Sequence, residues 1–143
     1  MFLGTSDHNL DSKGRVILPA EFRAELGETF YITMGFHRCA QVLSAAEFDR
    51  LREQIRLLPA DKALSLQYLL ISPAKPVSPN AQGRISIPQK LREDLGLNGE
   101  VTVVGMDTRV EIWDKDTWTR YFEEASDSFE EVAENLSDLL KNE

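Results

Sequence analysis

The hydrophobic and polar positions of this 143-residue chain follow one pattern twice. Residues 11–19, with the sequence DSKGRVILP, are echoed 69 positions later by residues 80–88, with the sequence NAQGRISIP. The echo continues to a leucine–glycine pair, Leu26-Gly27 in the first copy and Leu95-Gly96 in the second. Stacked repeat arrays generally need three or more units to bury a continuous core. Two copies therefore predict a pseudo-twofold pair that shares one core.

Each copy begins with the signals of a β-hairpin. In the first copy, Ser6–Leu10 is a short strand, Gly14 lies in a turn where it can adopt a positive φ, and Val16–Leu18 is a β-branched return strand. A proline, two apolar residues four apart and a glycine then predict a helix of about two turns. Two more strands complete each β-α-β-β unit. They cover residues 30–34 and 40–43 around a turn at Gly35, and residues 101–104 and 110–113 around a turn at Gly105.

Helices flank both units. Residues 44–47 form a capping box, and the apolar positions that follow fall at helical spacing up to Pro59. Similar spacing predicts a second connecting helix and further helices at the C-terminus. The pattern thus predicts an α+β fold, a pseudo-twofold pair of β-α-β-β units with flanking helices. The expected segments are a first unit at residues 5–47, a helical connector at 48–73, a second unit at 74–117 and an acidic C-terminal helical segment at 118–143.

The charge is distributed unevenly along the chain. A net charge of −8 argues, for the chain as a whole, against a nucleic-acid partner, because such binding relies on lysine and arginine. Residues 121–143, however, hold eight acidic residues and one basic residue, so this segment carries −7 and residues 1–120 carry only −1. The acidity is a property of the tail, and a few positioned cations on the nearly neutral body could still bind DNA.

Several other classes of site lack support in the sequence. A lone cysteine, Cys39, allows no internal disulfide, and without clustered cysteine or histidine we expect no metal site. No apolar run approaches the ~20 residues that cross a bilayer, and no secretory signal is evident, so we expect a cytoplasmic protein with no membrane association. No serine or cysteine has an evident base partner, so we expect no enzyme, no cofactor and no small-molecule substrate. Trp113 and Trp118 match Leu43 and Phe48 in the repeat, which favours core packing over base stacking.

The candidate chemistry lies in the two turns. Lys13 and Arg15 flank the glycine of the first turn, and Arg84 is the counterpart of Arg15 in the second. A rigid, exposed turn can direct such cations to phosphates or base edges, and arginine can pair bidentately with guanine. A single copy of this pattern is more often an ordinary hairpin whose charges stay in water. Its recurrence with the same strand, proline and helix favours a DNA contact, although a duplicated unit could keep the turn for folding alone.

Four other residues are expected to organise the turns. They are Asp11, Gly14, Asn80 and Gly83. The Asp11 carboxylate can accept backbone N–H groups of its turn and pair with Arg15, which fixes the direction of that side chain. Asn80 can cap its own turn through the side-chain oxygen but cannot offer Arg84 an ion pair.

The pattern Asp11-x-x-Gly14-Arg15-x-x-x-Pro19, its second copy and the opening Met-Phe-x-Gly resemble the MraZ family of bacterial proteins, which have two SpoVT-AbrB-like units. The similarity covers nearly the whole chain. It implies a swapped-hairpin-like β-barrel core and a ring-shaped homo-oligomer. It also implies a nucleoid-associated transcriptional regulator that binds direct repeats in double-stranded promoter DNA of the division and cell-wall gene cluster, including its own gene. Carried over by position, the DNA contacts are Lys13, Arg15 and Arg84.

Three positions depart from the family pattern. Asn80 replaces the usual aspartate, Gln82 stands where the first unit has Lys13, and Leu3 occupies a place that is often basic. The second unit should therefore be the weaker electrostatic partner of DNA. Because the body offers few cations, we expect binding that is weak per subunit, sensitive to salt and dependent on an assembly that repeats the turns.

A different function, an AbrB-type antitoxin or interaction module, is also compatible with the sequence. Such an antitoxin resembles the same superfamily and neutralises a protein partner through its tail, and residues 118–143 are acidic and amphipathic. Two fused units and a tail with an apolar face count against this alternative. Gene context separates the two hypotheses: a neighbouring methyltransferase gene and cell-wall genes favour the regulator, and an adjacent small toxin gene favours the antitoxin.

Overall fold

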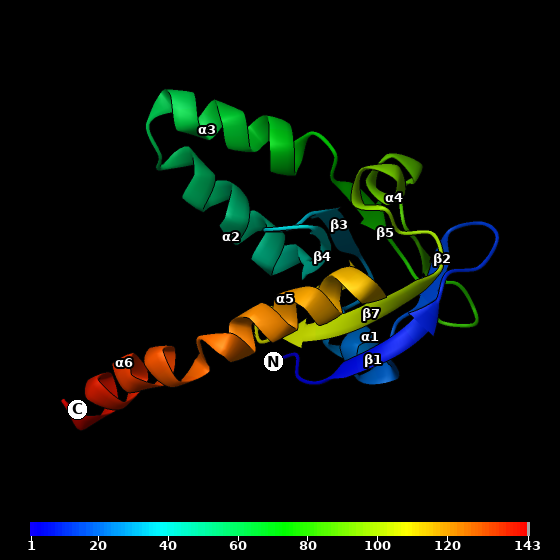
Figure 1. Ribbon diagram of the computed structural model, residues 1–143. Coiled ribbons are helices and arrows are strands. Elements are labelled where there is room, and N and C mark those ends of the chain that lie inside the picture. Colours follow the sequence, from blue (N-terminus) through cyan, green and yellow to red (C-terminus); the bar gives the residue numbers. More distant parts are fainter. Residues whose placement is uncertain (143) are drawn as a thin grey trace.

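The computed structural model describes residues 1–142 and has the α+β architecture that the repeat predicts (Figure 1). The first unit comprises β1 (Thr5–Asn9), β2 (Arg15–Ile17), α1 (Ala20–Leu26), β3 (Phe30–Met34) and β4 (Cys39–Ser44). The second repeats this order with β5 (Lys75–Val77), β6 (Arg84–Ser86), α4 (Gln89–Leu95), β7 (Glu100–Met106) and β8 (Arg109–Asp114). Between the units lie α2 (Ala45–Arg56), α3 (Ala60–Leu66) and a π-helical turn, η1 (Gln67–Ile71), and at the end lie α5 (Lys115–Asp127) and α6 (Phe129–Lys141).

The two units exchange strands. The main sheet is antiparallel and has six strands in the order β1-β7-β8-β4-β3-β5. At one edge β1 of the first unit pairs with β7 of the second, and at the other edge β5 of the second unit pairs with β3 of the first. Replacing each strand by its repeat counterpart reverses the order without changing it. The sheet therefore has the pseudo-twofold symmetry of the repeat, with its axis between β4 and β8.

Two predictions about the strands are wrong. β1 and β2 are not the arms of a local hairpin, because β2 pairs with β6 in a separate two-stranded sheet. The expected β-barrel does not close, since β1 and β5 remain the edges of the six-stranded sheet within residues 1–142. Burial explains the choice of partner. Pairing β2 with β6 sets Val16 opposite Ile85, and both side chains are fully buried, whereas β1 has only half-buried and exposed residues to offer.

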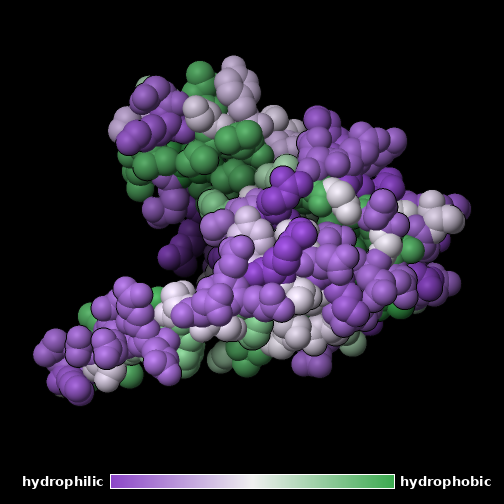
Figure 2. All heavy atoms as spheres, in the orientation of Figure 1, coloured by the Kyte–Doolittle hydropathy of each residue, from purple (hydrophilic) through white to green (hydrophobic). Residues whose placement is uncertain are grey.

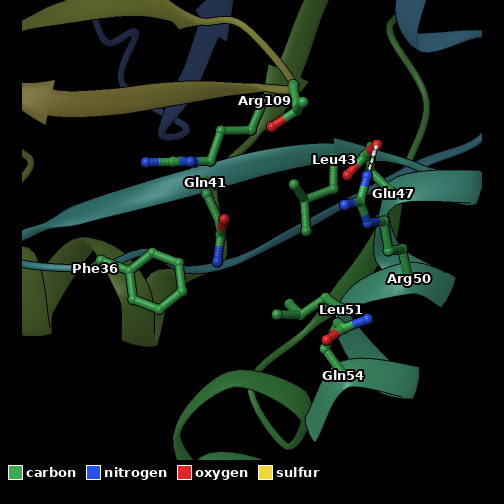
Figure 3. A pocket seen from close by; sticks show the side chains of 9 residues that line it. Phe36, Gln41, Leu43, Glu47, Arg50, Leu51, Gln54 and Arg109 are labelled. Atoms are coloured by element: carbon green, nitrogen blue, oxygen red, sulfur yellow. Dashed lines mark ion pairs between the residues drawn. The ribbon is translucent and has the colours of Figure 1, made fainter. Parts of the chain in front are cut away.

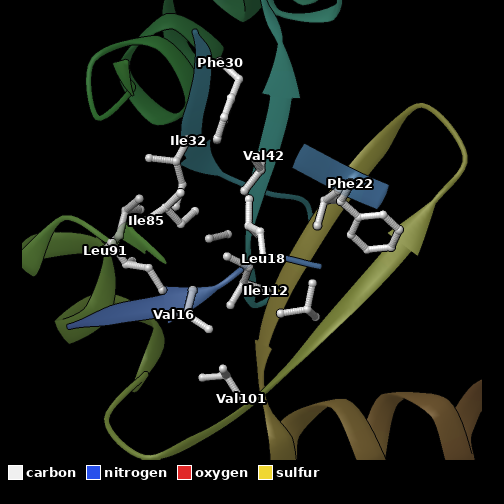
Figure 4. Close-up of a cluster of buried hydrophobic side chains, with 14 of the residues drawn as sticks. Val16, Leu18, Phe22, Phe30, Ile32, Val42, Ile85, Leu91, Val101 and Ile112 are labelled. Carbon is white, nitrogen blue, oxygen red and sulfur yellow. The ribbon is translucent and has the colours of Figure 1, made fainter. Parts of the chain in front are cut away.

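The main core collects equivalent residues from the two copies (Figure 4). It lies between the six-stranded sheet, the β2–β6 pair and helices α1 and α4. The repeat-related pairs in it are Val16 with Ile85, Leu18 with Ile87, Phe22 with Leu91 and Leu26 with Leu95. Each of these side chains is almost completely removed from water. Neither unit could bury its half of this set alone, which confirms the shared core that two copies predict.

Two equivalent helices, α2 and α5, pack on the opposite face of the sheet. Each begins with a side-chain cap: Ser44 accepts a hydrogen bond from the backbone of Glu47, and Asp114 accepts one from Thr117. Phe48 of α2 stacks on Tyr31 with ring centroids 4.4 Å apart, and Trp118 of α5 meets Trp113 at 5.4 Å. Trp113 is buried, so the prediction that the tryptophans pack rather than stack on bases agrees with the fold.

Gly105 lies inside β7 and not in the predicted turn, which occurs two residues later at Asp107, where φ is 60°. Here the N-terminal segment crosses the strand. The Gly105 N–H donates to the Gly4 carbonyl at 2.7 Å, and Phe2 and Asp107 exchange two backbone hydrogen bonds. A β-carbon on Gly105 would lie 2.5 Å from the backbone nitrogen of Leu3. This close approach of two backbones is the reason that the position requires glycine.

Replacing this glycine tests the crossing. We expect Gly105→Ala to lower the free energy of unfolding by about 1–3 kcal/mol in urea denaturation, because the Leu3 backbone must move away from the added methyl group. Gly99→Ala is the matched control, since Gly99 has open space around it and should change the stability by less than about 0.5 kcal/mol. Equal losses in the two variants would contradict this account.

Candidate nucleic-acid interface

The first turn is held by the carboxylate of Asp11. One oxygen, Oδ1, accepts hydrogen bonds from the backbone N–H groups of Lys13 and Arg15, each at 2.9 Å. The other oxygen, Oδ2, accepts a hydrogen bond from the Arg15 guanidinium at 2.7 Å. Gly14 has the positive φ, 74°, that the turn requires. A single carboxylate thus fixes both the backbone of the turn and the direction of the arginine.

These contacts change the acidity of Asp11. Its pKa lies below the ordinary value of 3.8, first because its carboxylate accepts the backbone hydrogen bond of Arg15. The Arg15 guanidinium and the Lys13 backbone lower the pKa further, against a smaller effect of desolvation. Asp11 is therefore ionised at neutral pH, and it balances part of the charge of Arg15.

The second turn has the same backbone but no ion pair. The Asn80 side-chain oxygen accepts hydrogen bonds from the backbone of Gln82 at 3.0 Å and of Arg84 at 2.9 Å. Gly83 has a φ of 79°, close to that of Gly14. Within residues 1–142, no acidic side chain forms a salt bridge with the Arg84 guanidinium. Arg84 is consequently less constrained in direction than Arg15 and keeps its full charge.

The two turns are tied together across the repeat. The Gly14 carbonyl accepts a hydrogen bond from Ile87 at 3.0 Å, and the Gly83 carbonyl accepts one from Leu18 at 3.1 Å. Each contact joins the turn of one unit to the residue that follows the β2 or β6 strand of the other. The turns are therefore fixed relative to one another, and Figure 1 shows their loops at the same end of the molecule, far from the C-terminus.

Two further arginines, Arg23 and Arg92, lie over the turns, and the sequence did not single them out. Arg23 in α1 donates from Nε to the Leu18 carbonyl at 3.1 Å, and Arg92 in α4 donates to the Ile87 carbonyl at 2.9 Å. A β-carbon on Gly14 would lie only 2.3 Å from the Arg92 guanidinium. Gly83 is in the same relation to Arg23.

The signal that could have revealed this pair is positional. Arg23 and Arg92 each stand four residues after the proline that starts the short helix of their copy, and both copies have arginine there. Each guanidinium crosses to the turn of the opposite unit. The surface around each turn is therefore composed of residues from both units.

The outward face of the β2–β6 pair adds the last elements of this surface. In the antiparallel register Arg15 lies opposite Ser86 and Ile17 lies opposite Arg84, while the residue between them in each strand is buried. The two arginines thus sit diagonally on one exposed face of a two-stranded ribbon. We call this face and the adjoining turns the turn surface. Its charged residues are Lys13, Arg15, Arg23, Arg84 and Arg92, with Asp11 as the acidic one.

A separate depression of about 250 Å³ lies beside α2 (Figure 3). Gln41 and Leu43 of β4 and the ring of Phe36 line it. Arg109 also lines it, with its guanidinium 5.8 Å from the Phe36 ring centroid and Nε 2.9 Å from a carboxylate oxygen of the buried Glu111. The cation in this depression is already neutralised, and none of the turn-surface residues contributes to its lining.

One contact of catalytic type exists that the sequence did not predict. Ser6 Oγ and His8 Nε2 lie 2.7 Å apart on the edge strand β1, but no carboxylate in residues 1–142 hydrogen-bonds the other ring nitrogen. The thiol of Cys39 donates to the Phe36 carbonyl, and burial raises its pKa, so the reactive thiolate does not form at neutral pH. In the same residues no cluster of three His, Cys, Asp or Glu side chains could hold a metal ion, and no helix is long and apolar enough to span a bilayer.

Comparison with protein families gives a match that covers both units. The family model described as "MraZ protein, putative antitoxin-like" matches residues 1–65 and 70–140. Each matched segment contains one of the two turns, and together the segments span nearly all of the chain. The match therefore includes every residue of the turn surface.

The pH dependence of stability tests the role of the Asp11 charge. Because the folded pKa is lowered, ionised Asp11 stabilises the fold at neutral pH, and this contribution is lost as the pH falls through the lowered folded value. Asp11→Asn should therefore have a lower Tm than the wild-type protein at pH 7, with the gap closing below about pH 3. Thermal unfolding followed by circular dichroism measures this difference.

Asn80→Asp is the matched variant in the second turn. It places a carboxylate where Asn80 now accepts the same two backbone hydrogen bonds, so it should raise the Tm at neutral pH and lose that gain in acid. A difference between wild-type and D11N protein that stays constant from neutral to acid pH would contradict the role of the charge.

Proposed function

The chain belongs to the MraZ family, and on this premise we propose that it is a sequence-specific DNA-binding transcriptional regulator. Its proposed targets are direct repeats in the promoter of the division and cell-wall gene cluster, including the promoter of its own gene. The protein acts in the cytoplasm at the nucleoid, as a ring-shaped homo-oligomer on double-stranded DNA. Lys13, Arg15 and Arg84 are the proposed DNA contacts.

The turn surface is the observation that carries this proposal. Five cations and one carboxylate lie around a two-stranded antiparallel ribbon whose outward face presents Arg15 and Arg84. A ribbon of this kind fits the major groove, where arginine pairs bidentately with the O6 and N7 atoms of guanine. The hydrogen bonds at Gly14 and Gly83 hold both turns before DNA arrives, which reduces the entropy lost on binding.

The residues of the turn surface divide into two kinds of contact. Arg15, held by Asp11, has a defined direction and suits base recognition, while Lys13 on the tip of the turn suits the phosphate backbone. Arg23 and Arg92 donate to backbone carbonyls through Nε, which leaves their terminal nitrogens to add positive charge beside each turn. These two arginines therefore support the ribbon and strengthen attraction to phosphates.

Assembly compensates for the small number of cations per chain. One subunit neutralises only a few phosphates, and each such contact weakens with salt. A ring presents identical turn surfaces at a fixed spacing, so that several repeats bind together at high effective concentration. The acidic helices α5 and α6 project away from the turn surface, so their negative charge does not oppose DNA there (Figure 1).

An antitoxin-like role in neutralising a protein partner is the second candidate. The apolar side chains of α6 are exposed, as a partner-binding tail requires, and the description of the matching family includes the words antitoxin-like. Binding to a protein through α6 would leave the turn surface free. The experiment below separates the two functions, because the antitoxin role does not require Arg15 for its partner contact.

Arginine substitutions test the DNA contact. In a gel shift at low salt with the upstream region of the gene, we expect Arg15→Ala to abolish the shifted band and Arg84→Ala to weaken it. The loss of one bidentate arginine contact costs about 1–3 kcal/mol per subunit, roughly tenfold to a hundredfold in Kd, and more when several subunits bind together.

Arg52→Ala is the control, because Arg52 is an exposed arginine of α2 that pairs with Asp49 and lies outside the turn surface. It removes the same charge and should bind like the wild-type protein. Circular dichroism should show that all three variants are folded. Near-wild-type affinity of the Arg15 variant, or an equal loss in the Arg52 variant, would sink the assignment of the turns as the DNA-reading element.

A further inference from the structure

A narrow apolar stripe runs along α5 and α6. Its members alternate at spacings of four and three residues: Trp118, Phe122, Ala125, Phe129, Val132, Leu136 and Leu139. This is the a and d spacing of a heptad repeat. Only Ser128 separates the two helices, and its carbonyl accepts a hydrogen bond from Val132, so the stripe passes from one helix to the next. Such a stripe is the seam of a coiled coil, narrower than the face of a helix that lies on a sheet.

Most of this seam is uncovered in the single chain. Trp118 packs against Trp113 at the body, but no residue of α6 is buried. The exposed fractions on α6 run from 57% at Leu136 to 68% at Phe129 and Leu139. Figure 1 shows α6 extending away from the body, and in Figure 2 the projecting helix is mainly hydrophilic in this view, with hydrophobic atoms at its margins. A contiguous apolar face of this length indicates an interaction surface.

The charges are arranged so that two copies of the seam can meet. The acidic residues after Phe122 occupy heptad positions b, c and f, away from the seam: Glu123, Glu124, Asp127, Glu130, Glu131, Glu134 and Asp138. The flanking positions e and g, which face the partner in a coiled coil, are uncharged: Ser126, Ala133 and Leu140 at e, and Ser128, Asn135 and Asn142 at g. Two of these acidic helices therefore bring no like charges together at the contact.

We propose that α6, with the last turns of α5, forms a two-helix coiled coil with the same segment of a second copy of this chain. This contact goes beyond the proposed function, because it involves none of the turn-surface residues and does not require DNA. It is also distinct from the head-to-tail contacts that close a ring, since identical surfaces meet about a twofold axis and join two copies only.

The second exposed apolar surface of the chain fits the seam poorly. It lies on α3, η1 and the preceding loop and consists of Leu57, Leu58, Leu64, Tyr68 and Leu69. Helix α3 has only seven residues and continues as the π-helical turn η1, whose wider winding breaks the regular spacing. Knobs-into-holes packing along a seam of several turns needs a partner helix of the same length and spacing, which α5 and α6 of a second copy provide.

The test uses the full-length protein with charges placed in the seam. Val132 and Leu136 are exposed, so the double variants V132E/L136E and V132K/L136K should fold normally. We expect light scattering at micromolar concentration to show an at least twofold lower molar mass for each than for the wild-type protein. Mixing the two variants should restore the mass, because glutamate on one helix then meets lysine on the other, and native mass spectrometry should show the mixed pair.

The matched control is L57E/L64E, which charges the apolar surface of α3 and should leave the molar mass unchanged. Arg15→Ala should also keep the wild-type mass, so failure of the seam and failure of DNA binding give separate results. The proposal is overturned if the wild-type protein has the 16.2 kDa mass of a single chain, or if V132E/L136E keeps the wild-type mass. It is also overturned if L57E/L64E reduces the mass as much, or if mixing the oppositely charged variants restores nothing.

Discussion

The pairing of β2 with β6 is the contact on which the rest of the structure depends. These two short strands bury Val16 against Ile85 under the sheet, and they belong to different copies of the repeat. The same crossing brings the carbonyls of Gly14 and Gly83 to the opposite unit and leaves Arg15 and Arg84 on one exposed face. Because the core and the turn surface both arise from this crossing, a change that separates the strands would remove stability and the candidate site together.

The order of elements could be predicted because local rules determine it. Proline before a short helix, apolar residues four apart and glycine after it give α1 and α4 without knowledge of the rest of the chain. The partners of the strands could not be predicted in the same way. β1 pairs with β7, and that choice depends on which surfaces the whole fold buries. Gly105 shows the same limit, because a glycine at a backbone crossing looks in sequence like a glycine in a turn.

The candidate site divides along the same line. The hydrogen bonds of Asp11 and Asn80 stay within four residues of the chain, so their chemistry could be anticipated from the residue types alone. Arg23 and Arg92 act on the turn of the opposite unit, so each appears in sequence as an ordinary surface residue of a helix. Membership of the MraZ family agrees with the repeat but does not identify the DNA contacts, which follow here from the geometry of the ribbon.

The difference between the two turns has a consequence for how DNA would be read. A perfectly twofold protein surface has no preferred direction and suits a palindrome, since it presents the same groups to either strand. Here one half offers a lysine and an arginine anchored by a carboxylate, and the other offers a glutamine and an arginine without an anchor. The surface therefore has a polarity, with a strong end and a weak end. A protein with such polarity orients itself on the double helix, and copies that face the same way call for sites that all point in one direction.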